Sequence, residues 1–160
     1  MSKHVSAPTD VLLVCSAGGH LFQLVLIADA WRDLSRAWVT LDREDSRSLL
    51  IGETVFYGHW PTTRNALNLV RNLRLAFRLV RRLRPRAIVT TGAGIAVPFA
   101  WVGRIFGAKV VYVESLTRIE APSLSCRLVS SVADRVYVQW PELTRTLPRS
   151  RYAGNVLGGA

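Results

Sequence analysis

The chain has 160 residues, which is enough for one domain built around a single hydrophobic core. Hydrophobic residues make up 49% of the chain, so the composition excludes a disordered or low-complexity protein. The 21 lysine and arginine residues outnumber the 11 acidic residues and give a formal charge of +10. A positive charge of this size predicts an anionic partner, such as nucleic acid, phospholipid head groups or a phosphorylated substrate.

The sequence contains no signal for membrane insertion or secretion. No run of about 18 apolar residues can span a bilayer, because glycine and proline interrupt the longest uncharged stretch, 87–102. Residues 1–9 are polar, unlike a signal peptide, and we expect them to be flexible. Cys15 and Cys126 lie far apart without metal-ligand spacing, so we expect free buried thiols in a reducing compartment. We expect no metal and no other cofactor.

Short apolar runs alternate with segments of helical periodicity along the chain. The predicted strands are 10–15, 36–41, 53–57, 86–90, 109–113 and 134–139, with a further short strand near 151–153. The predicted helices are 20–31, 65–83, 95–106 and 123–132, and residues 42–45 are expected to form a charged loop.

This alternation of strands and helices predicts an α/β protein with a Rossmann-like parallel sheet and helices on both faces. No composition break or linker suggests a second domain, so we expect a single domain over residues 1–160. In such sheets, ligands bind at the carboxyl ends of the strands, in the loops that lead into helices.

Two glycine-rich turns, 16–20 and 90–94, lie at this ligand edge of the predicted sheet. Neither has the spacing of a dinucleotide-binding turn or the lysine of a P-loop. Any tight turn between a strand and a helix needs glycine, so a purely structural role is the alternative. Two such turns in a very basic chain favour a phosphate or diphosphate ligand bound by backbone N–H groups. The candidate ligand-binding residues of these turns are Ser16, Gly18, Gly19, Gly92 and Gly94.

His20 and Glu114 are the candidate catalytic residues. His20 opens the first long helix at the ligand edge, where it could act as a base or as a donor to an oxyanion, with a capping or surface role as the alternative. Glu114 ends the apolar strand 109–113 and could activate a hydroxyl or bind sugar hydroxyls, with an arginine ion pair as the alternative.

The segment from Arg64 to Arg86 contains eight arginines and no acidic residue. Helical periodicity places six of them on one arc and apolar residues around most of the remainder. A core helix with a solvated basic face is the alternative, but it does not explain why no glutamate is interspersed. We expect this helix to bind anionic lipid, since RNA-binding sequence patterns are absent. The candidate membrane-binding residues are Arg64, Arg71, Arg74, Arg78, Arg81 and Arg82.

Five short segments together resemble a known family. The segments are SAGGH (16–20), TGAG (91–94), VYVES (111–115), SLS (123–125) and VQWPE (138–142). On these segments, the chain is similar to the acceptor-binding, membrane-recruiting subunit of the two-part UDP-N-acetylglucosamine transferase of asparagine-linked glycosylation, and to its bacterial PssD- and CpsF-type relatives in polysaccharide biosynthesis. The resemblance extends from about residue 11 to residue 157 and is most specific in YVES (112–115) and QWPE (139–142).

This resemblance implies the amino-terminal half of a split GT-B glycosyltransferase, which holds a polyprenyl-diphosphate-linked acceptor. A separate subunit would bind the UDP-sugar. The related single-chain transferase of peptidoglycan synthesis implies that the two glycine turns and His20 line the acceptor diphosphate, with Glu114 and Ser115 in the matching segment after the fifth strand. The eukaryotic subunit has an amino-terminal membrane helix. This sequence shows none, so attachment is expected to rest on the arginine helix and the partner.

The expected activity is transfer of a sugar from a UDP-sugar to the lipid-linked acceptor at the cytoplasmic face of the membrane, with His20 or Glu114 as the base. The protein is expected to be peripheral and inactive without its partner, and to bind no nucleic acid. One alternative is a non-catalytic membrane scaffold for the partner. The other is a standalone basic protein that binds RNA or a nucleotide.

Overall fold

A computed structural model describes residues 9–62 and 64–158 of the chain. Within these residues, seven strands form one sheet in the order β3-β2-β1-β4-β5-β6-β7, and every neighbouring pair is parallel. This confirms the predicted Rossmann-like architecture. The strands are β1 (Val11–Val14), β2 (Arg36–Thr40), β3 (Val55–Tyr57), β4 (Ala87–Thr90), β5 (Lys109–Val113), β6 (Arg135–Val138) and β7 (Arg151–Tyr152).

The helices connect these strands in the predicted order. Among the described residues, no helix combines the length and the apolar character needed to cross a membrane. The α-helices are α1 (Gly19–Leu26), α2 (Glu44–Leu49), α3 (Ala66–Leu83), α4 (Ala96–Ile105) and α5 (Leu124–Ser130), and the 3₁₀ helices are η1 (Ala28–Ala30) and η2 (Pro141–Arg145).

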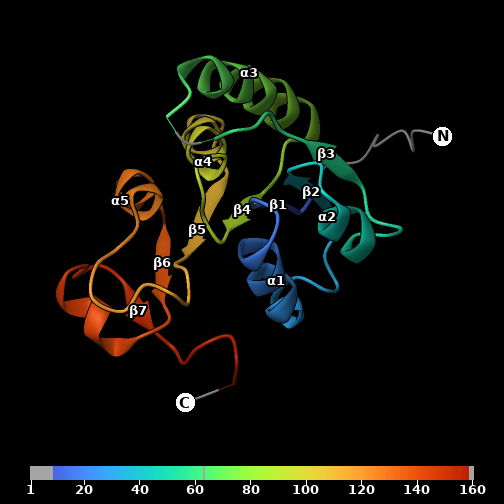
Figure 1. Ribbon diagram of the computed structural model, residues 1–160. Helices are drawn as coiled ribbons and strands as arrows, with labels where there is room; N and C mark the ends of the chain where they lie inside the picture. The colour runs from blue at the N-terminus through green and yellow to red at the C-terminus, as the bar shows by residue number, and fades with distance from the viewer. Residues whose placement is uncertain (1–8, 63, 159–160) are drawn as a thin grey trace.

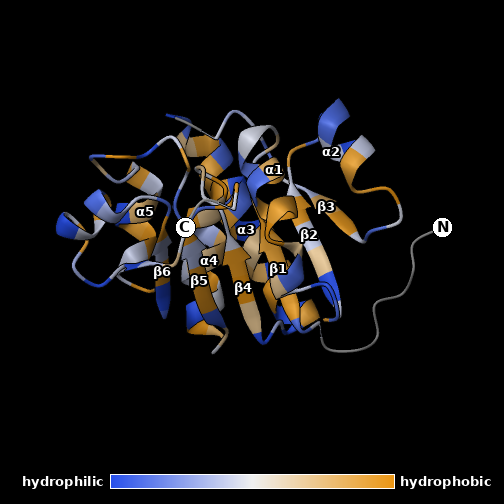
Figure 2. Cartoon of the chain, turned by 90° about the horizontal axis from the view of Figure 1, so that it is seen from below, coloured by the Kyte–Doolittle hydropathy of each residue, from blue (hydrophilic) through white to orange (hydrophobic). Residues whose placement is uncertain are grey.

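The helices divide between the two faces of the sheet (Figure 1). Helices α3, α4 and α5 cover one face, where α3 and α4 pack on β1, β2 and β4, and α5 packs on β5 and β6. Helices α1 and α2 lie on the other face, over β1 and β2. The central strands are mostly apolar, as their colour in Figure 2 shows, and β1 is buried on both faces between these layers.

Two predicted segments differ from the structure. The predicted helix 20–31 ends earlier, at Leu26, and continues only as the short 3₁₀ helix η1. The predicted loop 42–45 is wrong, because α2 begins inside it at Glu44. The Ser46 hydroxyl accepts a hydrogen bond from the Arg43 N–H at 3.1 Å and donates to the Leu41 carbonyl at 2.7 Å, which caps the helix. Acidic residues in the first turn further favour the helix start.

The expectation for residues 1–9 falls mostly outside the described residues. Thr9 is the exception: it is buried, and its N–H donates to the Leu83 carbonyl at 3.0 Å. Both cysteines are buried free thiols, as predicted. Burial raises the pKa of Cys15 to about 12 and also raises that of Cys126, so neither is a nucleophile near neutral pH.

Asp134 ties the start of β5 to the end of the α5–β6 connection. Its carboxylate accepts a hydrogen bond from the Val110 N–H at 2.9 Å and lies 3.2 Å from both the Arg104 guanidinium and the Lys109 ammonium. The Val110 N–H and then the two cations lower the pKa of Asp134 below its ordinary value of 3.8.

We predict that Asp134→Ala lowers the free energy of unfolding at pH 7 by about 1 to 2 kcal/mol. A lowered folded-state pKa means that this stabilisation is complete above the ordinary value of 3.8 and is lost as the pH falls through the folded-state pKa. Urea denaturation at pH 7 and in acid measures both effects. Asp29→Asn, at a highly exposed ion pair, is the control and should change little. Equal losses at both pH values would contradict the assignment.

Candidate functional site

The predicted site residues gather at the carboxyl ends of three adjacent strands. The parallel register aligns Val14 of β1 with Thr90 of β4, and Thr90 with Tyr112 of β5. The loops that follow these strands therefore leave the sheet side by side. They contain both glycine-rich turns and Glu114, so the structure brings together most of the residues that the sequence singled out.

His20 is held by a reciprocal pair of hydrogen bonds to Thr91. The His20 Nδ1 lies 2.7 Å from the Thr91 carbonyl oxygen, and the Thr91 hydroxyl donates to the His20 carbonyl at 2.6 Å. A carbonyl oxygen can only accept, so Nδ1 must be the donor and carry a proton. In the neutral imidazole, Nε2 is then the unprotonated nitrogen. The ring is thus fixed in the tautomer that a general base requires.

The second glycine-rich turn is shaped by close packing. Gly92 has a φ of +105°, and a Cβ at this position would collide with the Tyr112 hydroxyl. At Gly94, a Cβ would come within 2.6 Å of the Thr62 carbonyl oxygen. Both glycines are therefore required by the fold, whatever the turn binds.

The first glycine-rich turn contacts an acidic residue, Asp45 on α2, that was not among the predicted site residues. The Gly18 N–H donates to the Asp45 carboxylate at 2.5 Å, so a side chain from α2 already occupies this backbone donor. Gly19 is the first residue of α1, and Ser16 directs its hydroxyl to the neighbouring Ala17 carbonyl at 3.3 Å. Asp45 was missed because the segment that contains it was predicted to be a loop.

Glu114 is fully buried and does not face the open edge of the sheet. Its carboxylate accepts hydrogen bonds from the Ser115 N–H at 2.7 Å, the Ser123 N–H at 2.8 Å and the Ser123 hydroxyl at 3.0 Å. The side chain of Ser115 in turn contacts the Thr117 hydroxyl at 3.0 Å. The arginine ion pair considered as an alternative for Glu114 is absent from the described residues, where these groups satisfy the carboxylate instead.

Two further residues complete this edge. Gln23 on α1 accepts a hydrogen bond from the Leu116 N–H at 2.7 Å, which joins α1 to the loop after β5. Burial, followed by the charge of Glu114, raises the pKa of Tyr112, so its hydroxyl stays protonated beside Gly92. Sequence patterns gave no sign of Gln23, because its partner lies 93 positions away. Thr91, in contrast, stood inside a turn that was already recognised.

Helix α3 presents three faces. One is buried against the sheet and α4, and five of the predicted arginines lie exposed on a second. Arg64 precedes the helix, with a φ of 52°, and is not part of this arc. The third face is an exposed apolar stripe that includes Val70, Leu73 and Phe77, and Phe77 packs edge-on against Phe106 with ring centroids 5.3 Å apart. The five arginines on α3 are Arg71, Arg74, Arg78, Arg81 and Arg82.

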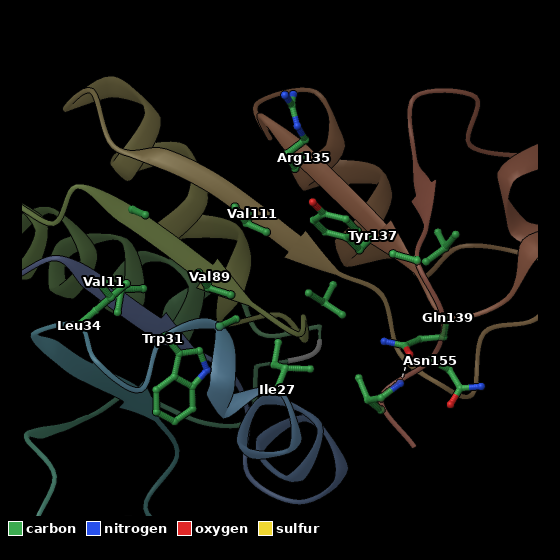
Figure 3. Close-up of a pocket in the computed structure, with 17 residues that line it drawn as sticks. Val11, Ile27, Trp31, Leu34, Val89, Val111, Arg135, Tyr137, Gln139 and Asn155 are labelled. Atoms are coloured by element: carbon green, nitrogen blue, oxygen red, sulfur yellow. Dashed lines mark hydrogen bonds between the residues drawn. The ribbon is translucent and has the colours of Figure 1, made fainter. Parts of the chain in front are cut away.

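None of the helices in the described part of the chain covers the α1 side of β4, β5 and β6, where an apolar groove with a volume of about 500 Å³ lies. Figure 3 shows Val89, Val111 and Tyr137 on neighbouring strands of its floor, with Trp31 at its border. The Trp31 Nε1 is the one buried side-chain nitrogen or oxygen in the described part of the chain that lacks a hydrogen-bond partner. The residues from 153 to 156 close the far side.

Solved structures of longer proteins share this fold. MurG from Acinetobacter baumannii has a TM-score of 0.68 and 17% identity, over 83% of this chain and 42% of that one. A UDP-N-acetylglucosamine 2-epimerase from Rickettsia bellii has a TM-score of 0.73 and 10% identity, over 94% of this chain and 46% of that one. This chain thus spans less than half the length of these structures and corresponds to one lobe of a GT-B-type fold.

The curated relatives are proteins named UDP-N-acetylglucosamine transferase subunit ALG14. The Homo sapiens protein is 26% identical over 92% of this chain and 83% of its own length. The Mus musculus protein is 34% identical over 65% of this chain and 44% of its own length. The family described as "Oligosaccharide biosynthesis protein Alg14 like" matches residues 60–156, which is more than half of the sequence. The chain therefore belongs to the Alg14-like family of oligosaccharide biosynthesis proteins.

Proposed function

We propose that this chain is the acceptor-binding subunit of a two-part glycosyltransferase that uses a UDP-sugar. The observation that carries the proposal is the contact between His20 Nδ1 and the Thr91 carbonyl, which leaves Nε2 as the proton acceptor of the neutral imidazole and joins the two glycine-rich turns. The names of the relatives support a transferase subunit, and the likeness to one half of MurG supports an incomplete cleft. A separate UDP-sugar-binding subunit would supply the opposite wall.

In the proposed reaction, a polyprenyl-diphosphate-linked sugar is the acceptor. His20 Nε2 accepts the proton of the acceptor hydroxyl as its oxygen bonds to the anomeric carbon of the donor sugar, while the bond from that carbon to UDP breaks. The Thr91 carbonyl keeps its hydrogen bond from Nδ1 throughout, which stabilises the imidazolium that forms. The ring needs no rearrangement in this step.

The acceptor diphosphate would bind across the two glycine-rich turns. The first turn of α1 begins at Gly19, and the N–H groups of a first helical turn have no intrahelical partner, so they are available to an anion. Because the Asp45 carboxylate occupies the Gly18 N–H, the diphosphate would bind beside it, at Gly19, or displace it. Gly92 and Gly94 would border the other side of this ligand.

We assign Glu114 a positioning role rather than proton transfer. Its carboxylate is fully buried and already accepts three hydrogen bonds from Ser115 and Ser123. Exchange of a proton with a substrate would require these bonds to break. Glu114 instead fixes the loop after β5, and with it Ser115, at the ligand edge.

We infer that the partner subunit covers the apolar groove on β4, β5 and β6. Parallel sheets are normally covered on both faces, whereas Val89, Val111 and Tyr137 are only half-buried here. A partner element with an apolar face would complete their burial. An oxygen on that element could accept the hydrogen bond that the Trp31 Nε1–H lacks.

We further infer that α3 attaches the protein to the cytoplasmic face of the membrane. Its exposed apolar stripe lies next to the exposed arginine arc, which is the arrangement of an interfacial amphipathic helix. Apolar side chains would enter the lipid while the guanidinium groups bind phosphates at the surface.

The role of His20 as the base can be tested by removing its side chain. In the complex purified with its partner, His20→Ala should lower turnover by about 100-fold or more, because a general base contributes about that factor. Co-purification of the partner should not change, and the melting temperature should fall only slightly, because one hydrogen bond to the Thr91 carbonyl is lost. Transfer assays with a UDP-sugar and a lipid-linked acceptor measure this effect. Full activity in His20→Ala would favour the non-catalytic scaffold over the proposed role.

The role of the apolar groove as the partner interface can be tested by placing a charge in its floor. Val111→Lys should abolish co-purification of the partner, because a lysine in the floor of the groove would have to be desolvated on binding. Ile105→Lys, at an exposed position on α4 and on the other face of the sheet, is the matched control and should leave the partner bound. Retention of the partner by both variants would exclude the groove as the interface.

The role of the apolar stripe of α3 in membrane attachment can be tested by placing a charge in it. Phe77→Asp should reduce flotation with anionic vesicles by about tenfold or more, because a charge replaces a ring that would enter the lipid. Ile51→Asp replaces another exposed apolar side chain, just after α2 and away from α3, and should float normally. Unchanged flotation of Phe77→Asp would show that α3 does not enter the bilayer.

A further inference from the structure

A pocket lined by basic side chains lies between α3 and the segment that follows β3. It has a volume of about 320 Å³ and is separate from both the glycine-rich turns and the apolar groove. Three arginines and one histidine are among its five lining residues. The lining residues are His59, Arg71, Arg74, Leu75 and Arg78.

Buried asparagines on α3 fix the wall of this pocket. Asn72 is 2% exposed and binds the His59 backbone at both ends: its Oδ1 accepts from the His59 N–H at 2.8 Å, and its Nδ2 donates to the His59 carbonyl at 2.9 Å. Asn68 donates to the Pro61 carbonyl at 3.1 Å and accepts from the Arg71 guanidinium at 3.2 Å. Gly58 permits this close approach, because a Cβ there would collide with Ile95. The segment is therefore held in place before any ligand binds.

The pocket concentrates positive charge that the protein does not neutralise. Arg71, Arg74 and Arg78 lie on one face of α3, at spacings of three and four residues, where like charges destabilise a helix. Within residues 9–62 and 64–158, none of the three forms an ion pair with a carboxylate. An anion seated among them would relieve this repulsion.

The surroundings favour a lipid as the source of that anion. Val70, Leu73 and Phe77 lie exposed along the neighbouring face of the same helix. Val70 and Leu73 cannot stack on the bases of a nucleic acid, whereas the acyl chains of a lipid would pack on these two side chains and on Phe77, beside the lipid phosphate.

We propose that this pocket binds the phosphomonoester group of a membrane lipid. A terminal phosphate presents three oxygens, which match the bidentate geometry of several guanidinium groups, and the His59 ring closes the pocket beside them. Arg81 and Arg82 lie further along α3 and do not line the pocket, so they contribute only general attraction to a negative surface. The proposal rests on the proposed membrane attachment of α3 and adds a specific head group to it.

The experiment compares two sets of phosphatidylcholine vesicles with matched surface potential, one containing phosphatidic acid and the other phosphatidylglycerol. The wild-type protein should bind the phosphatidic acid vesicles about tenfold more tightly, because a terminal phosphate accepts several charge-assisted hydrogen bonds. The double variant Arg74→Gln/Arg78→Gln should lose this preference and still bind both sets weakly. The control Arg81→Gln/Arg82→Gln, which removes the same charge, should bind both sets less tightly and keep the preference.

Equal binding of the wild-type protein to both vesicle sets would overturn the specific pocket but leave the membrane attachment intact. Binding to neither set would overturn both. Glycerol 3-phosphate and inorganic phosphate form the soluble arm, measured by titration calorimetry. If the protein bound either soluble phosphate as tightly as it binds phosphatidic acid vesicles, the proposal that the ligand is a lipid would be wrong. The same conclusion would follow if single-stranded RNA, at a similar concentration, displaced the protein from those vesicles.

Discussion

The reciprocal hydrogen bonds between His20 and Thr91 are the interaction on which the ligand edge depends. They join two loops that are 71 positions apart in sequence, and they set the protonated nitrogen of the imidazole. A histidine at the start of a helix would otherwise be free to choose either tautomer and several rotamers. Removal of the Thr91 carbonyl from its present position would disturb the base without touching any substrate contact. The tight turn at Gly92, which packs on the Tyr112 hydroxyl, keeps that carbonyl in place.

The buried carboxylate of Glu114 braces the same edge from the next strand. An isolated carboxylate in the interior would be very costly, but three donors from Ser115 and Ser123 compensate for its lost hydration. Because Ser123 also caps α5, Glu114 couples the loop after β5 to the start of that helix. Gln23 then ties the same loop back to α1. The three loops at the edge are thus connected to one another through side chains, and the proposed base sits on a rigid support.

Periodicity predicted the strands and long helices well, because the inner strands are short, mostly apolar runs and the long helices repeat their apolar residues at helical spacing. Asn65 and Ser123, which cap α3 and α5, marked helix starts that the structure confirms to within a residue. Helix α2 was missed, since most of its six residues are polar and show no apolar periodicity, and only the acidic first turn indicated a helix.

At the site, the sequence could indicate that His20 and Glu114 lie at the same edge of the sheet. It could not indicate that one is half-buried and the other enclosed, because their partners, Thr91 and Ser123, are set by tertiary structure.

The three proposed surfaces are compatible with one another in space. Helix α3 lies on one face of the sheet and the apolar groove on the opposite face, so lipid and partner would not compete. The ligand edge lies between them. The segment after β3 leaves the sheet at this same edge, because all the strands are parallel, and Thr62 of that segment approaches Gly94. Contact of a lipid phosphate with Arg71, Arg74 and Arg78 on α3 would therefore turn the glycine-rich turns toward the bilayer surface. An acceptor anchored by its polyprenyl chain would present its diphosphate at that surface, within reach of His20, while the opposite face stays open to the subunit that brings the sugar donor.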